Sequence, residues 1–229
     1  MPEFDLARKS VRALNSALHN LPPDINETHW RVANPRGQHA IAAGLDSPIL
    51  LQIDGHVGYY CAGMNKQATV VVNGNAGQGV AENMMSGKVW IKGDASQAAG
   101  ATGCGGILVI DGNASARCGI SMKGIDIVVK GSVGHLSAFM AQAGNLVVLE
   151  DSGDALGDSI YEARLYVRGN VSSLGADCIE KKMEHRHRTD LGRLLEAAGI
   201  NGEVDVNEFR RYGSARRLYH FHIDNAGAY

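Results

Sequence analysis

Cysteine and histidine are the residue types in this sequence that could bind a metal ion or act as nucleophiles. The chain has 4 Cys, at positions 61, 104, 118 and 178. None of them forms the Cys-x-x-Cys pair that is typical of zinc, iron–sulfur or redox sites. We therefore expect free thiols. Cys61 and Cys118 occupy the same position of a repeat, three units apart, which predicts inward-pointing core thiols too distant for a disulfide.

Two pairs of histidines are further candidates for metal ligands. His185 and His187 follow Cys178 in the chain, but residues two apart point in different directions on a helix, and no fourth ligand is evident. His220 and His222 would share one face of an extended segment, where nearby arginines favour contact with a protein partner. The sequence therefore predicts no metal site.

Glycine-rich runs and carboxylates complete the set of candidate groups. The runs 77–79 and 103–106 could cradle a phosphate, but they lack the Lys-Ser/Thr pair of a P-loop, so repeat turns are the better interpretation. Carboxylates on the outer face of a β-helix can cleave polysaccharides, although no spacing here fixes a catalytic pair. The carboxylates concerned are Glu82, Asp154, Asp158 and Glu162. A solvated edge is favoured for them, and we nominate no catalytic, cofactor-binding or metal-binding residue.

A repeat of 19 residues predicts the strands and turns that must position these groups. Its marker positions are Gly55, Gly74, Gly93, Gly112, Gly131, Glu150 and Gly169, each 19 residues after the last. The residues two and four positions before each marker are apolar, an alternation that predicts one buried strand per repeat. The residue after the marker is mostly Asn, Asp or Ser, whose side chains bond nearby backbone in tight turns. The departure of Glu150 from glycine predicts one irregular coil and a bulge that faces a partner.

Two columns of small residues indicate how the repeats stack. Only Gly, Ser or Ala occurs three and seven residues after each marker, which predicts close approach of backbone or side chains there. The period is too short for helix-pair repeats or propeller blades. The sequence thus predicts an all-β, single-stranded, parallel β-helix of about seven coils, right-handed because parallel crossovers nearly always are. A left-handed hexapeptide β-helix, with roughly 18 residues per coil, is the alternative.

The flanks are predicted to cap the open ends of this rod. Residues 1–45 are assigned to an N-terminal cap, with an amphipathic helix over about 4–21 and an irregular first coil over 28–45. Residues 46–177 are assigned to the β-helix. Residues 178–229 are assigned to a helix from Ile179 that closes before Gly199, and to a basic, aromatic docking arm over 207–222. The arm residues are Phe209, Arg210, Arg211, Tyr212, Arg216, Arg217, Tyr219, His220, Phe221 and His222.

Composition narrows the possible functions. A hydrophobic fraction of 45% with 20% charged residues is an ordinary globular balance and excludes disorder. A formal net charge of −2 gives no reason to expect nucleic acid or an anionic membrane. No stretch reaches the ~18 apolar residues of a membrane-spanning helix, and Arg8, Lys9 and Arg12 interrupt any signal-peptide core. We expect a cytoplasmic protein.

The repeat of Gly-x-x-Gly/Ser after an apolar strand resembles the GXGXG domain. That domain forms the carboxy-terminal β-helix of the glutamate synthase large subunit and also occurs in formylmethanofuran dehydrogenase, as one of its subunits. The chain is also similar to the stand-alone GXGXG subunit of N-methylglutamate synthase and its glutamate synthase-like relatives. The similar segments are 34–45, 55–66, 79–87, 131–142 and 156–163. The resemblance covers about residues 25–180 and, more loosely, the tail.

This resemblance implies a complex of three kinds of polypeptide. The others are a class II glutamine amidotransferase-like subunit and a synthase subunit that carries FMN and iron–sulfur clusters. The complex would make N-methylglutamate from methylamine and glutamate, or glutamate from glutamine and 2-oxoglutarate. This chain would hold no cofactor and would be a non-catalytic scaffold of the hetero-oligomer. The catalytic amino-terminal cysteine belongs to the amidotransferase-like subunit, which agrees with the start Met1-Pro2-Glu3 of this chain.

Two other functions stay open at this point. One is a β-helix subunit of a formylmethanofuran dehydrogenase-like complex, which would have tungsten or molybdenum partners. The other is an autonomous polysaccharide-active enzyme, which would need a long outer cleft lined with carboxylates and aromatic residues. An aromatic content of 6% argues against the second of these.

Overall fold

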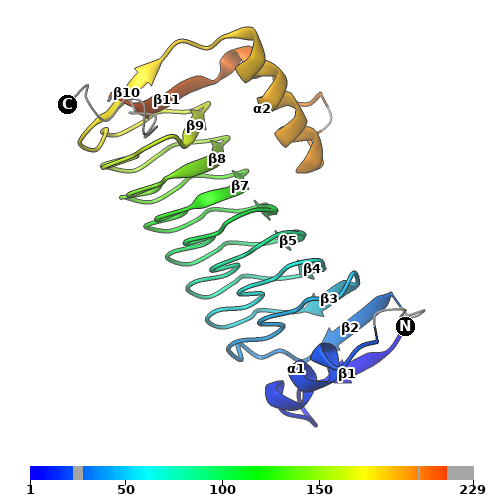
Figure 1. The fold of residues 1–229 in the computed structure, drawn as a ribbon. Helices are drawn as coiled ribbons and strands as arrows, with labels where there is room; N and C mark the ends of the chain where they lie inside the picture. The colour runs from blue at the N-terminus through cyan, green and yellow to red at the C-terminus, as the bar shows by residue number, and fades with distance from the viewer. Residues whose placement is uncertain (23–27, 201, 216–229) are drawn as a thin grey trace, which may run out of the picture.

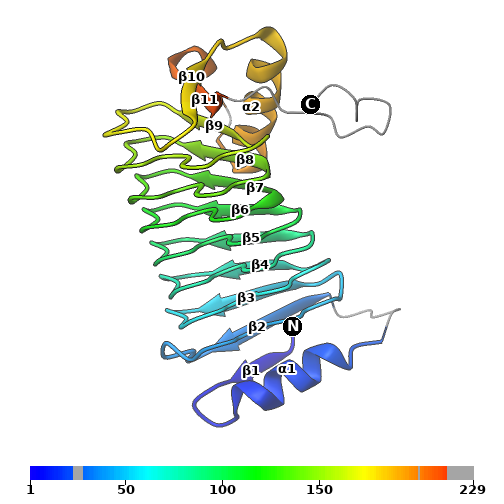
Figure 2. The ribbon, with the colours of Figure 1, turned by 60° about the vertical axis from the view of Figure 1, so that its left-hand side comes forward.

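The structure is a computed structural model that describes residues 1–22, 28–200 and 202–215 of the chain. These residues form a rod of stacked coils, and each coil contributes one strand to a long sheet (Figure 1). A second view shows the strands in a regular stack along the rod (Figure 2). A short helix lies at the amino-terminal end, and a longer helix lies beside the carboxy-terminal coils.

The described part of the chain contains eleven strands, two α-helices and one 3-10 helix. The strands are β1 (Glu3–Asp5), β2 (His29–Ala33), β3 (Leu50–Asp54), β4 (Thr69–Val72), β5 (Lys88–Ile91), β6 (Ile107–Ile110), β7 (Lys123–Val129), β8 (Ala143–Val148), β9 (Arg164–Val167), β10 (Cys178–Lys181) and β11 (Arg210–Ser214). The helices are α1 (Val11–His19), α2 (His185–Ala197) and the 3-10 helix η1 (Val206–Glu208).

The sheet confirms the predicted parallel β-helix. Strands β1 to β9 pair in chain order and in parallel, and β11 and β10 follow in antiparallel pairing. Residues that pair between neighbouring coils are 19 apart in the sequence, so that Leu51 faces Val70 and Val70 faces Val89. The first coil departs from this period, because His29 faces Leu50, 21 residues later, although the strand pairing itself is continuous. The winding sense and the division at residues 45 and 177 stay predictions.

The interior of the rod is filled by its own side chains. Inward strand positions such as Leu51 and Ile53 are fully buried, and each such side chain contributes about 1.5–3 kcal/mol of stability. The structure adds an inward column that we did not predict, two residues after each repeat marker. It starts with Val57, Ala76 and Ala95, which are buried and joined by isolated parallel bridges. The apolar residues at this position were a visible signal in the sequence.

After each strand and its turn the chain bends through a corner, where alternate residues have positive φ, the left-handed conformation. In one coil Tyr60, Ala62 and Met64 have φ of 57°, 53° and 57°, and equivalent residues repeat in other coils. Such a conformation costs a non-glycine residue about 1–2 kcal/mol. It is held because the N–H of Tyr60 donates to the next coil and that of Ala62 to the previous one. The middle member faces the core, which explains the small residues seven positions after each marker.

Both columns of small residues mark places where coils touch. A Cβ on Gly100 would lie 2.6 Å from Cδ1 of Ile127, and one on Gly77 would lie 2.6 Å from the carbonyl carbon of Gly58. One assignment in these columns is wrong. In the last coil the N–H of Gly175 donates to the Leu156 carbonyl, so Gly175 and not Ala176 continues the core-facing column.

A ladder of side chains joins the turns at the strand ends. Each residue after a marker accepts a hydrogen bond from the backbone N–H of its equivalent in the next coil. The bonds run from Asn75 to His56 (2.9 Å), Asp94 to Asn75 (3.0 Å), Asn113 to Asp94 (2.7 Å), Ser132 to Asn113 (2.9 Å), Asp151 to Ser132 (3.2 Å) and Asn170 to Asp151 (2.7 Å). The sequence predicted polar turn residues that bond nearby backbone, and the structure shows that this backbone belongs to the neighbouring coil.

A second hydrophobic core lies on the outer face of the sheet, against α2. Val109, Val128 and Val147 point outward and are fully buried there, in one cluster with Leu191 and Leu194 of the helix. Each of the strands β6 to β9 ends in three consecutive apolar residues, which is typical of strands covered on both faces. We predicted the helix but not this packing.

The flanking helices are shorter than predicted. Phe4 belongs to β1, and α1 begins only after Ser10, whose Oγ accepts the N–H of Ala13 at 3.2 Å. At the other end Ile179 belongs to β10, so α2 starts later than predicted, and it ends before Gly199 as predicted. In both places an apolar residue that suited a helical pattern pairs in a strand instead.

The first half of the predicted docking arm is part of the rod's own cap. Arg210–Ser214 form β11, which lies between β9 and β10, and Phe209 and Tyr212 are buried. Removal of the chain after Gly202 would therefore expose the edge of β9. The arm residues Arg216, Arg217, Tyr219, His220, Phe221 and His222 lie outside the described residues.

The irregular coil predicted at Glu150 is also absent from its expected place. The Glu150 N–H donates to the Gly131 carbonyl, and its own carbonyl accepts from Gly169, so the ladder continues. The register shifts elsewhere: between Lys123 and Asp126 in β7, and in the last coil, where Val171 faces Ser152 but Leu174 faces Leu156.

Substitution of Gly100 tests the core-facing column. Gly100→Leu should lower the free energy of unfolding by about 2–5 kcal/mol, because it adds overpacking against Ile127 to left-handed strain at φ 68°. Urea denaturation measures the change. Gly192→Ala in α2 is the control: its Cβ meets nothing within 4 Å, so stability should rise by about 1 kcal/mol. Unchanged stability of Gly100→Leu would contradict the inward assignment.

Candidate functional site

The four cysteines are free in the structure, and three of them are buried. Burial raises the pKa of the Cys61 and Cys118 thiols to about 12, and that of Cys178 to about 11. The inward orientation predicted for Cys61 and Cys118 is confirmed. Cys104 is exposed, and its Sγ lies 3.6 Å from the Thr102 carbonyl. Three of these thiols are therefore packing groups, and Cys104 is the accessible one.

The histidine candidates do not meet in a metal site. His187 is buried and its Nδ1 accepts the N–H of Glu184 at 3.1 Å, as part of the capping box of α2. His185 is exposed on the same helix. Across the described residues, no group of three or more His, Cys, Asp or Glu could hold a metal ion. His220 and His222 lie outside the described range.

The glycine-rich runs are repeat turns, as interpreted from the sequence. The backbone N–H of Gly77 donates to the Val57 carbonyl, and that of Gly79 donates to the Gln97 carbonyl. In the second run the N–H groups of Gly103 and Gly105 donate in the same way. A phosphate cradle needs free N–H groups, and these are used to join coils and close turns.

The candidate carboxylates are dispersed along the rod. Asp154 accepts from the Ser173 hydroxyl at 3.0 Å, and Asp158 accepts from the Ser159 hydroxyl at 2.8 Å. Glu82 lies in the amino-terminal half of the rod beside Tyr60, while Glu162 lies near its carboxy-terminal end beside Arg164. Asp154, Asp158 and Glu162 belong to one coil, and Glu82 lies four coils before it.

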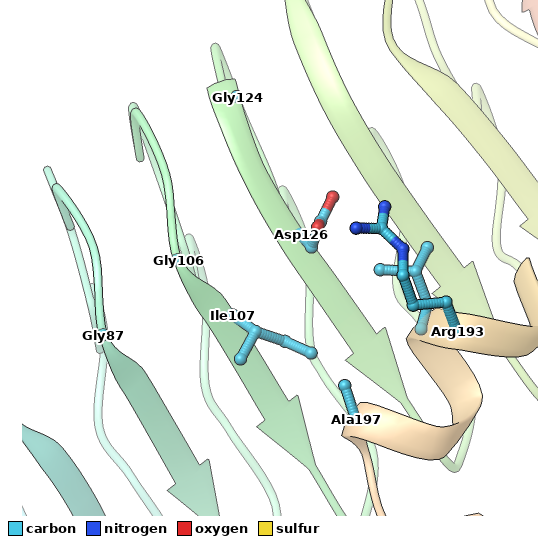
Figure 3. Close-up of a pocket in the computed structure, with 8 residues that line it drawn as sticks. Gly87, Gly106, Ile107, Gly124, Asp126, Arg193 and Ala197 are labelled. Carbon is cyan, nitrogen blue, oxygen red and sulfur yellow. The ribbon is translucent and has the colours of Figure 1, made fainter. Parts of the chain in front are cut away.

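A groove between α2 and the sheet contains one carboxylate that we did not single out. Gly87, Gly106 and Gly124, at the starts of β5, β6 and β7, line the groove. Asp126 of β7 faces Arg193 of α2 across it (Figure 3). Burial raises the pKa of Asp126, although Asn145 donates a hydrogen bond to it at 2.7 Å. The described lining residues include no nucleophile and no second acid. The groove lies where α2 packs on the sheet, with Arg193, Leu194 and Ala197 of the helix in its wall.

Two groups of exposed apolar side chains lie on the corners of the coils. The first, the tyrosine patch, consists of Tyr59, Tyr60, Met64 and Met85, which are 45–53% exposed. The Tyr59 ring stacks on His39, with 4.5 Å between the ring centroids. Tyr60 packs edge-on against Tyr59, with 6.4 Å between their centroids. The second, the methionine patch, consists of Met140 and Tyr161, both 44% exposed.

The two patches share a side of the rod, because Met140 occupies the same repeat position as Met64. They are four coils apart, which corresponds to ~19 Å along the rod at about 4.8 Å per coil. Contiguous exposed apolar groups on a soluble surface are typical of contact sites for other proteins. Neither patch was predicted from the sequence, since an apolar residue in a repeat is first assigned to the core.

Thiol labelling tests the assignment of the cysteines. At pH 8 a thiol of pKa near 12 is only about one part in 10⁴ thiolate, so native protein should react quickly at Cys104 alone. Time-resolved iodoacetamide labelling with peptide mass spectrometry measures this. Cys104→Ser should abolish the fast phase, and urea should expose all four thiols. Fast native labelling of Cys118 would refute its core position.

Neither described helix has the length and hydrophobicity that crossing a bilayer requires.

Known proteins share both the fold and the sequence of this chain. No family model matches the chain. A chain of the formyltransferase/hydrolase complex (FhcABCD) from Methylorubrum extorquens, solved with methylofuran, has a similar fold: the TM-score is 0.68 at 22% identity, over 91% of this chain and 89% of that one. Protein GlxC of Rhizobium meliloti (strain 1021) is 63% identical over 229 residues, 100% of both chains. At that identity over its full length, the chain belongs to the family of Protein GlxC.

Proposed function

We propose that this chain is a non-catalytic structural subunit of a glutamate synthase-like complex, with N-methylglutamate synthase as the first candidate. It would act in the cytoplasm, between an amidotransferase-like subunit and a flavin-binding synthase subunit. FMN and iron–sulfur clusters would belong to the partners. The resemblance of its repeat segments to the stand-alone GXGXG subunit supports this assignment, as does full-length similarity to Protein GlxC.

The observation that carries the proposal is the pair of apolar patches on one side of a filled rod. Columns of fully buried side chains fill the interior of the described coils, so contact with other molecules falls to the surface. Hydrogen bonds between coils fix the distance from the tyrosine patch to the methionine patch. A rigid spacing suits a subunit that holds two partners so that a small amine passes between their sites.

A second candidate is a β-helix subunit of a formylmethanofuran dehydrogenase-like complex. The similar fold of a chain in the FhcABCD complex favours it. The two candidates differ in the partners that they require, because flavin and iron–sulfur clusters belong to the first and a tungsten or molybdenum centre to the second.

Purification of the native complex tests the proposal. The full-length chain, tagged at its own locus, should copurify with an amidotransferase-like and a synthase-like subunit, and the preparation should show flavin and iron–sulfur absorbance. Subunit mass spectrometry, visible spectroscopy and metal analysis measure this. Tungsten or molybdenum in the preparation, with formylmethanofuran dehydrogenase-like partners, would favour the second candidate instead. A colourless chain purified alone would contradict both.

Variants of the tyrosine patch test its role in assembly. Tyr60→Asn with Met64→Asn should weaken partner binding by about 30-fold or more, as loss of an aromatic anchor does. The fold should persist, because Asn tolerates left-handed backbone and Asn83 already occupies the position equivalent to Met64, at φ 55°. Pull-down and melting temperature measure the two effects. The control is Ile179→Asn, at a 43% exposed apolar residue outside both patches, and equal loss there would contradict a specific docking role.

A further inference from the structure

The carboxy-terminal end of the rod contains a pocket lined mainly by cationic side chains. It lies where the chain enters β9, beside β10, β11 and the first turn of α2, and has a volume of about 220 Å³. The charged residues in its wall are Arg164, Lys181, Arg186, Arg211 and Glu162, and His187 and Tyr161 are also titratable. We call this the cationic pocket. Three separate segments of the chain supply these groups, so the pocket exists only in the folded cap.

Two of the cations lack a carboxylate partner among the described residues. Arg164 pairs with Asp190 at 3.4 Å, and Arg186 pairs with Glu184 at 2.9 Å. For Lys181 and Arg211, no carboxylate in the described part of the chain lies within 4.0 Å. Arg211 directs its Nε to the Lys182 carbonyl, at 3.1 Å. Glu162 is the lone carboxylate among the described wall residues, so positive charge is in excess there.

The fields of these cations act on one another. Burial lowers the pKa of Arg211. Tyr166 and Glu184 oppose this shift, and the nearby positive charges of Arg164 and Arg186 add to it. The pKa of His187 is lowered by burial and then by Arg211 and Arg186. A bound anion would relieve this repulsion, because opposite charge stabilises the protonated form of each group.

His187 adds a directed donor to the pocket. Its Nδ1 accepts the Glu184 N–H, so in the neutral imidazole the proton must sit on Nε2. No acceptor among the described residues takes this Nε2–H. The side chain is 2% exposed and borders the pocket, which leaves Nε2 available to a ligand.

We propose that the cationic pocket binds a small oxyanion, a phosphate or a carboxylate group. Guanidinium groups bind both in bidentate geometry, with ammonium and imidazole N–H groups as further donors. The volume is below that of pockets for drug-sized ligands, which limits the ligand to a small molecule or a single anionic group. This site does not depend on the proposed scaffold function, since its residues lie in the cap of this one chain.

Calorimetric titration of the full-length chain at low salt tests the site, with inorganic phosphate in one series and succinate in another. Saturable binding of one equivalent is expected for at least one probe, and preference between them identifies the anion class. Arg211→Gln and Lys181→Gln should each weaken binding by about tenfold or more. Arg8→Gln is the control, because Arg8 is an 85% exposed arginine at the other end of the rod, and its binding should equal wild type.

Circular dichroism and melting temperature establish that each variant is folded. If Arg211→Gln fails to fold, Lys181→Gln and Arg211→Lys carry the test, and Arg211→Lys should bind more weakly than wild type because it loses the bidentate fork. Absence of saturable binding for both probes would overturn the proposal. Equal affinity in wild type, Lys181→Gln and Arg8→Gln would also overturn it, because this would indicate nonspecific ion effects.

Discussion

Hydrogen bonding between coils in a constant register is the constraint on which this molecule depends. Each coil takes backbone donors and acceptors from its two neighbours, at strands, at turns and at the left-handed corners. A slip by one residue would reverse inward and outward positions along a strand. It would also separate the polar side chains of the turns from the N–H groups that they bind, such as Asn113 from Ser132. The left-handed residues cost energy singly, and the two flanking coils hold them in place.

The ends of the rod show how a repetitive structure is closed. A parallel ladder exposes an unpaired edge at its last coil. Here β11 returns from a distant part of the sequence and covers β9 in antiparallel pairing, with Tyr212 opposite Leu165. The helix α2 covers the outer faces of the last strands in the same region. Because the cap gathers segments that follow no repeat, it is also where charged groups from different segments can converge.

The residues that stabilise the rod are therefore different from those available for contact with other molecules. Side chains inside the coils have no contact with other molecules, and three of the cysteines are among them. The apolar patches and the cationic pocket lie on corners and at the cap, where a residue can change without disturbing the stack. Such an arrangement suits a protein that positions partners through its surface.

The sequence by itself determined the fold, because each coil repeats the same physical requirements at fixed positions. The strand residues, the small residue before a left-handed corner and the polar turn residue could be identified from the 19-residue period, and the core thiols followed from it. It did not determine the path of the flanks, where Phe4, Ile179 and Tyr212 pair in strands although the apolar spacing or charge suggested otherwise. Tertiary structure decided these, together with the apolar patches and the cationic pocket. The reason is that Arg164, Lys181 and Arg211 meet only when β9, β10 and β11 pair, and no local pattern encodes contacts between segments so far apart in the chain.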